Sequence, residues 1–321
     1  MLHQPAETGE QLSAVESPHE RLRPLLRHWQ VRGRDYWLGA FPWLMGIVNA
    51  TPDSFSDGGQ WFAPEAAVAH ALQLAEDGAE VLDIGGESTR PGSTPVSPEE
   101  ELRRVIPVIE GLRGQTDRMI SIDTTKAVVA KAALAAGADI VNDVSGCRFD
   151  PEMPAVCAAS DAGVIVMHMR GTPQTMQTNP TYDNVVAEVL AHLEESASRL
   201  IQAGVARERI LFDPGIGFGK TPEHNIDLLA NVAALRGTGR PVLIGHSRKQ
   251  FLKRLLGRPV EERLFGTLGV AVAVAQQRAD LIRVHDVGPT RDTLLAWRAV
   301  IERMPPGSES PRQNTSEGAG R

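Results

Sequence analysis

The sequence predicts an α/β fold, a single-domain (β/α)8 TIM barrel, and two observations carry this prediction. Eight short apolar runs, each of the length of a buried strand, recur between residues 44 and 284. Longer segments, rich in Ala and Leu and with helical periodicity, separate them. Regular alternation of strands and helices indicates a parallel sheet covered by helices, and eight such units are the number that closes a barrel.

Each expected strand is an apolar run bounded by turn-forming or polar residues, as suits a strand buried on both faces. The runs are Leu44–Val48, Val81–Ile84, Met119–Ile122, Ile140–Val141, Val164–Met167, Ile210–Phe212, Val242–Ile244 and Leu281–Val284. The first run stops abruptly at Asn49, before a long polar loop that ends in glycines. In such a sheet the chemistry gathers where the strands end, so these loops are the expected working surface.

Proline near the first turn and glycine after the last turn mark the ends of several expected helices. The helices are Pro64–Glu76, Pro98–Leu112, Lys126–Ala136, Pro151–Ser160, Asp183–Ala203, Pro222–Leu235, Pro259–Arg278 and Pro289–Met304. A further helix is expected to open at Ser247, Arg248 and Lys249. No linker interrupts this pattern, so we assign residues 41–304 to one barrel domain.

Residues 1–40 form an N-terminal extension to the predicted barrel. Within it, Leu25–Leu38 contains two short semi-apolar pieces around Gly33, which predicts a hairpin that caps the barrel bottom. Residues 1 to about 20 and the tail 305–321 are polar and lack periodicity, so we expect both to be disordered and dispensable.

Composition excludes several classes of function. The net charge of -7 in 321 residues, without a dense Lys/Arg cluster, argues against a nucleic-acid partner. Cys147 and Cys157 form no CxxC pair, so neither a disulfide framework nor a structural metal is indicated. No apolar run reaches the roughly 20 residues of a membrane span and no signal-peptide core begins the chain. We therefore expect a soluble, cytoplasmic protein.

Polar side chains stand at or just past nearly every expected strand end. They are Asn49, Asp83 with Glu87, Asp123, Asn142 with Asp143, His168, Asp213, His246 with Ser247, and Arg283 with His285 and Asp286. Any one of them has about even odds of being a helix cap or a satisfied core residue. Capping does not explain the whole set, and in a barrel all of these residues converge on one mouth. Arg283 and His285 alternate along a strand, so they share a face and can grip one anion.

Three loops refine the expected site. Thr51–Gly59 and Glu87–Ser97 are long, rich in Gly, Pro and Ser, and charged, which suits mobile lids. Asp213–Lys220 (DPGIGFGK) is similar to a phosphate loop, but Pro214 stands where that motif needs glycine. We expect its glycines to let the backbone lie close to a flat ligand.

Eight ordered motifs between about Met45 and Asp286 resemble those of bacterial dihydropteroate synthases. They are NATPDSFSDGG, DIGGESTRPG, SIDTTK, VNDVSG, MHMRGTPQTMQ, DPGIGFGK, SRK and RVHDVG. The resemblance implies a (β/α)8 barrel, a homodimer and a transferase of folate biosynthesis that sulfonamides inhibit. It also implies Mg²⁺ as a cofactor. The implied reaction joins p-aminobenzoate to 6-hydroxymethyl-7,8-dihydropterin pyrophosphate and releases pyrophosphate.

The resemblance also implies roles for single residues. Asn49 matches the position that meets the metal and pyrophosphate, and Phe218 the position that helps to hold p-aminobenzoate. The pterin pocket is matched by Asp123, Asn142, Asp213 and Lys249, and the remaining substrate contacts by Thr89, Arg90, Arg283 and His285. Of these, Asp123, Lys249, Arg283 and His285 are implied to be catalytic. Gln250 departs from the family, where Ser is common, and this puts the rim of the p-aminobenzoate site in doubt.

The chemistry of these residues agrees with the resemblance. A pterin edge carries N–H donors together with N and O acceptors. Two carboxylates, an amide and an ammonium can satisfy this edge, and the residues concerned are Asp123, Asp213, Asn142 and Lys249. Pyrophosphate calls for cations and a hard metal, which Arg283, His285 and Mg²⁺ at Asn49 would supply.

Three alternatives stay open at this point. A pterin-dependent methyltransferase would use a similar pocket but has no need of a pyrophosphate grip or of the two lids. A metal-dependent hydrolase would use His168, His246 and His285, but Asn49 stands where its paired histidines would be. A non-catalytic pterin-binding barrel would be expected to have lost its lids first, and both are intact in the sequence.

Overall fold

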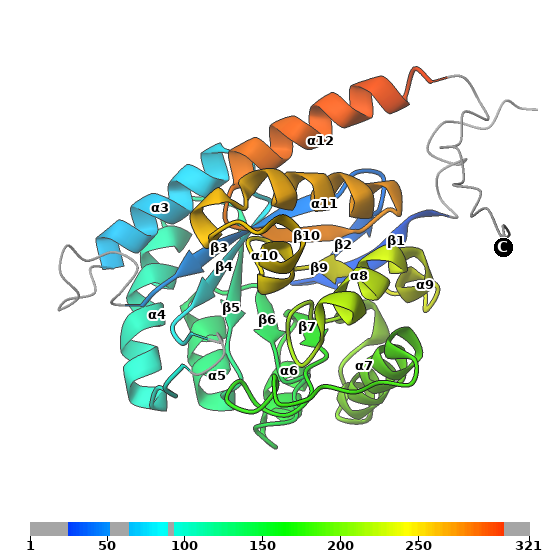
Figure 1. The fold of residues 1–321 in the computed structure, drawn as a ribbon. Coiled ribbons are helices and arrows are strands. Elements are labelled where there is room, and N and C mark those ends of the chain that lie inside the picture. The colour runs from blue at the N-terminus through cyan, green and yellow to red at the C-terminus, as the bar shows by residue number, and fades with distance from the viewer. Residues whose placement is uncertain (1–24, 52–63, 89–92, 305–321) are drawn as a thin grey trace, which may run out of the picture.

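The computed structural model describes residues 25–51, 64–88 and 93–304. Within these residues eight parallel strands form one sheet, in the order β8-β7-β6-β5-β4-β3-β10-β9. The strands are β3 (Trp43–Asn49), β4 (Val81–Gly85), β5 (Met119–Asp123), β6 (Ile140–Asp143), β7 (Gly163–Met167), β8 (Ile210–Asp213), β9 (Leu243–Ile244) and β10 (Leu281–Val284). A bridge between Phe212 and Val242 brings β8 and β9 together and closes the barrel (Figure 1). The predicted fold class is confirmed.

Helices cover the outside of the barrel (Figure 1). They are α3 (Pro64–Glu76), α4 (Pro98–Arg113), α5 (Ala127–Ala136), α6 (Met153–Ala158), α7 (Val185–Gln202), α8 (Pro222–Ala230), α9 (Val232–Arg236), α10 (Gln250–Leu256), α11 (Leu264–Gln276) and α12 (Val287–Ile301), with short 3-10 turns at Arg207–Arg209 and Val260–Glu262. In the part of the chain that the structure describes, none of these helices is long and apolar enough to cross a membrane.

Two expected helices differ from the structure. The segment 222–235 is not one helix but two, because Asn231 leaves the helical conformation (φ -120°, ψ 29°) between α8 and α9. The segment 259–278 opens with a 3-10 turn, and its α-helix begins only at Leu264. Apolar periodicity continues across both breaks, so the sequence pattern could not reveal them.

The interior of the barrel changes from apolar to polar along four of its strands, β4, β6, β8 and β10. Its lower layer consists of side chains from seven strands, namely Met45, Val81, Ile140, Ile165, Leu211, Leu243 and Leu281. Because alternate residues of a strand share a face, the residue two positions further on also points inward. At that level stand Asp83, Asn142, Asp213 and Arg283. Buried polar groups therefore lie directly above this lower layer of side chains, which we call the apolar plug.

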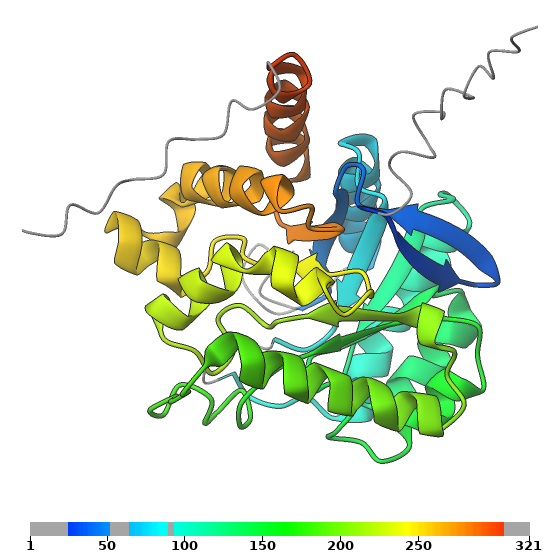
Figure 2. The same cartoon turned by 90° about the vertical axis from the view of Figure 1, so that its right-hand side faces the viewer.

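A hairpin of β1 (Arg27–Val31) and β2 (Arg34–Leu38) closes the lower end of the barrel. Its two-residue turn at Arg32 and Gly33 has positive φ at both positions (51° and 70°), which matches the twist of paired strands. Trp29 is fully buried against the apolar plug, and its Nε1 donates to the Arg209 carbonyl (3.0 Å). Figure 2 shows the hairpin at the right-hand end and the loop after β7 at the opposite end.

We expect Trp29→Ala to lower the free energy of unfolding by about 3–5 kcal/mol, because it opens a cavity in the plug. Trp37→Ala is the matched control, since Trp37 lies on the same hairpin but is 49% exposed. The control should change stability by less than about 1 kcal/mol. Urea denaturation of both variants measures the difference, and equal losses would show that the hairpin does not seal the barrel.

Candidate active site

Arg283 lies in the mouth between two carboxylates. Its Nε donates to Asp83 Oδ2 (2.6 Å) and its Nη2 donates to Asp123 Oδ2 (2.8 Å). Asn142 Nδ2 also donates to Asp83 Oδ2 (3.2 Å). Asp83 is fully buried, so the guanidinium is its counter-charge inside the barrel. The network joins β10, β4, β5 and β6 across the mouth.

Burial and neighbouring charge shift the protonation of this network. Burial raises the pKa of Asp123 to about 7, and the carboxylates around it add to the shift, although Arg283 opposes it. Burial also raises the pKa of Asp143, to about 6. In the opposite sense, burial lowers the pKa of Lys249 to about 8, with Asp213 opposing that shift. These groups therefore titrate closer to neutral pH than they would in water.

A second group of residues follows β8 and β9. Asp213 is buried, and its Oδ1 accepts a bond from the Gly215 N–H (2.7 Å). Lys249 is the residue before α10, as the sequence predicts. Its ammonium donates to the Ile216 carbonyl and lies 4.5 Å from the centre of the Phe218 ring. The pair Lys249 and Phe218 thus forms a cation and ring surface beside Asp213.

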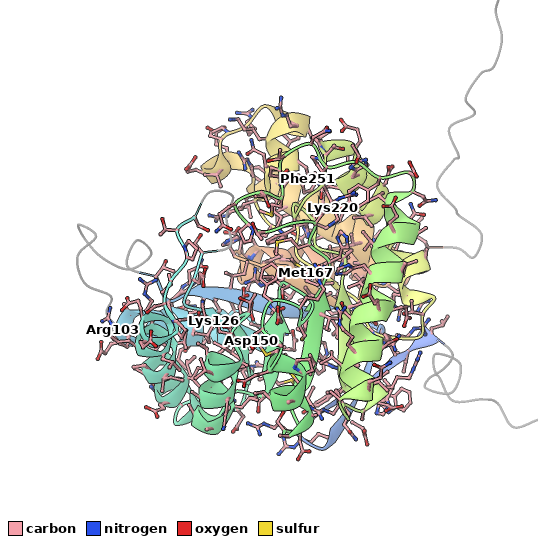
Figure 3. All side chains as sticks on the ribbon, turned by 90° about the horizontal axis from the view of Figure 1, so that it is seen from below. Arg103, Lys126, Asp150, Met167, Lys220 and Phe251 are labelled. Atoms are coloured by element: carbon pink, nitrogen blue, oxygen red, sulfur yellow. The ribbon has the colours of Figure 1, made fainter. Side chains whose placement is uncertain are left out.

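An apolar wall faces this group. Val144, Met167, Met169 and Met176 form one cluster, with Phe218 packed against it. Methionine side chains are polarisable and adapt to flat rings, so the wall offers a face for an aromatic ligand. Figure 3 labels Met167 near the centre of the molecule as seen from below, with Lys220 above it and Lys126 to its lower left. Our sequence reasoning did not name this wall, although the MHM of MHMRGTPQTMQ marks part of it.

The glycines of the loop after β8 adopt a backbone that other residues rarely enter. Gly215, Gly217 and Gly219 have φ of 68°, 86° and 65°. A Cβ at Gly215 would lie 2.0 Å from the His168 carbonyl oxygen, and one at Gly217 would lie 3.0 Å from Lys249 Cδ. These glycines therefore let the loop pack closely against other parts of the protein, namely His168 and Lys249.

The three histidines of the hydrolase alternative point to different partners. His168 Nδ1 lies 2.9 Å from Lys220 Nζ, His246 Nε2 lies 2.9 Å from the Thr267 carbonyl, and His285 Nδ1 lies 3.0 Å from Ser247 Oγ. Within residues 25–51, 64–88 and 93–304, no group of three or more His, Cys, Asp or Glu side chains could hold a metal ion. The site that the hydrolase alternative requires is not formed by these residues.

The structure brings most of the residues singled out from the sequence to one end of the barrel. Those that follow or end the strands there are Asn49, Asp123, Asn142, Asp213, Phe218, Lys249, Arg283 and His285. His285 lies one residue past β10, and its backbone N–H donates to Ser247 Oγ (3.3 Å). Thr89 and Arg90 lie outside the described residues, as do residues 52–59 of the first expected lid, residues 89–92 of the second, and both chain ends (1–24 and 305–321).

Two buried residues of the mouth had no assigned role in our sequence reasoning. Asp83 holds both Arg283 and Asn142, and Lys220 is buried beneath the glycine loop. Asp83 carried a signal, since it stands inside a strand that is otherwise apolar. Lys220 carried only the misleading signal of an incomplete phosphate-loop motif.

Comparison with known proteins places this architecture in a family. The family model described as pterin binding enzyme matches residues 45–285. The dihydropteroate synthase of Escherichia coli K12 is 47% identical over 261 residues, which are 81% of this chain and 90% of that protein.

Solved structures agree. A Xanthomonas albilineans dihydropteroate synthase with 4-aminobenzoic acid has a TM-score of 0.80 and 48% identity, covering 87% of this chain and 100% of that one. The same protein solved with 7,8-dihydropteroate has a TM-score of 0.77 and 46% identity, with the same coverage of both chains. The Yersinia pestis enzyme with a sulfonamide drug has a TM-score of 0.80 and 40% identity, covering 86% of this chain and 99% of that one. The chain therefore belongs to the pterin binding enzymes and, among them, to the dihydropteroate synthases.

Proposed function

We propose that this chain joins p-aminobenzoate to 6-hydroxymethyl-7,8-dihydropterin pyrophosphate, forming 7,8-dihydropteroate and pyrophosphate in folate biosynthesis. The observation that carries the proposal is a buried polar edge next to an apolar wall. Asp123, Asn142 and Asp213 form the edge, and the Met167 cluster with Phe218 forms the wall. Relatives solved with 4-aminobenzoic acid and with 7,8-dihydropteroate support the choice of substrates.

The polar edge suits a pterin ring. Buried Asp213 and Asn142 offer acceptors and a donor to the N–H and C=O groups of the ring edge. Lys249 adds a donor beside Asp213. A ring that fails to satisfy these groups leaves them unpaired in a water-poor cavity, which is costly, so the edge selects its ligand.

The second substrate would lie against Phe218 and Lys249. The Phe218 ring, with the Lys249 ammonium beside it, offers an aromatic face next to the pterin pocket. Gln250 is the exposed first residue of α10 and lies next to Lys249 in the chain, so it belongs to the rim of this site. Its departure from the serine common in the family would act there and not on the reaction.

The pyrophosphate group of the substrate would be bound by Asn49, Arg283, His285 and Mg²⁺. Asn49 ends β3 and offers one carboxamide oxygen, a hard donor. This oxygen could hold a magnesium ion, with pyrophosphate and water as the further oxygen donors that such an ion needs. When bound, the ion would neutralise charge on the leaving group. Arg283 would serve the same charge from the floor of the mouth, where Asp83 and Asp123 orient it.

The chemistry asks little of the protein beyond binding and charge stabilisation. An arylamine is a weak nucleophile, whereas the electron-rich dihydropterin can stabilise a developing cation on its methylene. We therefore expect pyrophosphate to depart ahead of amine attack. Arg283 and His285 would stabilise the negative charge that grows on the leaving group, and the closed lids would keep water away.

A methyltransferase and a non-catalytic pterin-binding barrel fit less well. The two relatives described above, from Escherichia coli and Xanthomonas albilineans, are named as synthases. The matching residues extend over the whole mouth, up to position 285. Nothing in this arrangement favours transfer of a methyl group or loss of turnover.

We further propose that two copies of the chain associate through α10–α12. Apolar side chains are exposed on this side of the barrel, and Phe265 on α11 is 83% exposed. The others are Leu255, Leu256, Val260, Leu295, Val300, Ile301 and Met304. A helix that is apolar on its outer face as well as its inner face is typical of a subunit interface. A second copy of the same surface would cover this face with twofold symmetry.

The purified chain should form 7,8-dihydropteroate and release pyrophosphate rapidly only with both substrates and Mg²⁺ present. Asp213→Ala should bind a pterin analogue about 10- to 100-fold more weakly, because a buried charged acceptor is lost. Asp117→Ala, on an exposed loop, is the control.

A sulfonamide should compete with p-aminobenzoate. A pyrophosphate-release assay that shows no dependence on the arylamine would contradict the proposed reaction.

Pterin affinity should fall in acid because of Asp123. A carboxyl whose pKa is raised to about 7 takes up a proton as the pH drops through 7, and the protonated carboxyl is a weaker acceptor for ring N–H groups. Calorimetry with a pterin analogue should give about tenfold weaker binding at pH 6 than at pH 8. Asp123→Asn should flatten this slope. If the slope persists in the variant, another carboxyl such as Asp143 titrates instead.

Phe265→Glu should convert a dimer into a monomer, because it places a charge in the centre of the proposed interface. Sedimentation equilibrium should give twice the 34.7 kDa chain mass for the wild type and one chain mass for the variant. Val128→Glu, at an exposed apolar site on α5, is the matched control and should stay dimeric. A monomeric wild type would refute the interface.

A further inference from the structure

The lysine that ends the DPGIGFGK motif is turned inward, under its own loop. Lys220 is buried, and its Nζ lies 2.9 Å from the Gly215 carbonyl oxygen and 3.0 Å from the Phe218 carbonyl oxygen. Its third close neighbour is His168 Nδ1, at 2.9 Å, and the His168 carbonyl oxygen lies farther away, at 3.4 Å. An anion-binding lysine needs an open coordination side, and this one has none.

The three contacts satisfy Lys220 in either protonation state. An ammonium donates to all three atoms, and His168 is then neutral with its proton on Nε2. A neutral amine donates to the two carbonyls and accepts from a protonated Nδ1. Burial lowers the pKa of Lys220 and, together with the lysine, lowers that of His168 to about 2, so His168 carries no charge. The role of the pair is therefore geometric and does not depend on a net charge.

The two carbonyls that Lys220 holds are the two ends of one turn. The Phe218 N–H donates to the Gly215 carbonyl (3.1 Å), so Lys220 bonds both the acceptor and the donor residue of this turn. Gly215, Gly217 and Gly219 give the loop little rigidity of its own. Other bonds hold the loop at different points, with Gly217 N donating to Asn225 Oδ1 (2.6 Å) and Tyr182 Oη donating to the Gly219 carbonyl (2.7 Å).

The turn determines where the Phe218 ring stands. That ring packs on the apolar wall of Val144, Met167, Met169 and Met176 and lies 4.5 Å from the Lys249 ammonium. Asp213, in contrast, belongs to β8, and the sheet fixes its backbone, although its Oδ1 also accepts a bond from the Gly215 N–H at the start of the turn (2.7 Å). A change at Lys220 should therefore move the ring of Phe218 more than the carboxylate of Asp213.

We propose that Lys220, supported by His168, is a positioning residue for the p-aminobenzoate site: it clamps the Gly215–Phe218 turn and so sets the Phe218 ring. This inference rests on the proposed function, since it names which of the two substrates depends on the clamp. Lys220 would then resemble a phosphate-loop lysine that binds the carbonyls of its own loop instead of a phosphate.

The first test is Lys220→Met, which keeps the length of the side chain and removes every hydrogen bond. The KM for p-aminobenzoate should rise about 10- to 100-fold, the effect of misplacing a binding group by about an ångström. The KM for dihydropterin pyrophosphate and the calorimetric affinity for 6-hydroxymethylpterin should stay within about threefold. Lys131→Met, on the exposed face of α5, is the matched control and should leave both KM values unchanged.

A second pair of variants tests the clamp if Lys220→Met does not fold. His168→Asn places a carboxamide oxygen near the position of Nδ1, whereas His168→Leu places none there. His168→Leu should raise the KM for p-aminobenzoate in the same selective way, and His168→Asn should restore it toward the wild-type value. A purely structural role would predict equal loss of stability and no selectivity between the substrates.

Equal rises in both KM values, a loss of kcat with neither KM changed, or unchanged kinetics in Lys220→Met would each overturn the inference. A wild-type chain that releases no pyrophosphate with both substrates present would refute the proposed function instead. The two failures are therefore distinguishable in one set of assays.

Discussion

The ion pairs of Arg283 are the constraint on which the rest of the mouth depends. Asp83 and Asp123 stand inside a barrel, where an unpaired carboxylate would be costly, and the guanidinium pairs with both, although its single positive charge offsets only one negative charge. Removing one partner of such a buried pair costs about 3–5 kcal/mol, because the other is left without compensation. The apolar plug and the hairpin beneath it keep water out from below. This seal is the reason that burial shifts the pKa of Asp123 and Lys249 so far.

The two sides of the mouth differ in chemistry, and this difference can orient a ligand. The side formed by β4, β5, β6 and β10 is polar and carries Asp83, Asp123, Asn142 and Arg283. The side that follows β7 and β8 carries the methionine cluster and Phe218. A flat ring with one polar edge fits in one direction only, because the opposite direction would bury unpaired donors against methionine. Orientation thus comes from the fold and needs no moving part.

The sequence predicted the strands and the positions of the site residues because both depend on local pattern. Apolar runs, prolines and glycines mark strand and helix ends, and polar residues at those ends must converge once the barrel closes. The partners of those residues could not be predicted in this way. Arg283 and Asp83 are 200 positions apart, and their pairing follows only from the order of the strands, in which β10 and β4 flank β3. The inward turn of Lys220 likewise depends on glycine φ values and on His168, neither of which a motif encodes.

The closure between β8 and β9 is thin. Its described ladder is the one bridge of Phe212 with Val242, whereas β3 and β4 pair over five residues. Local opening is easiest where the fewest backbone bonds must break, so this seam is the weak line of the barrel. Asp213 ends β8, on one side of this seam, and Lys249 follows β9, on the other side. A ligand bound by both residues would link the two sides and oppose their separation, so the substrate itself would stabilise the weakest part of the barrel.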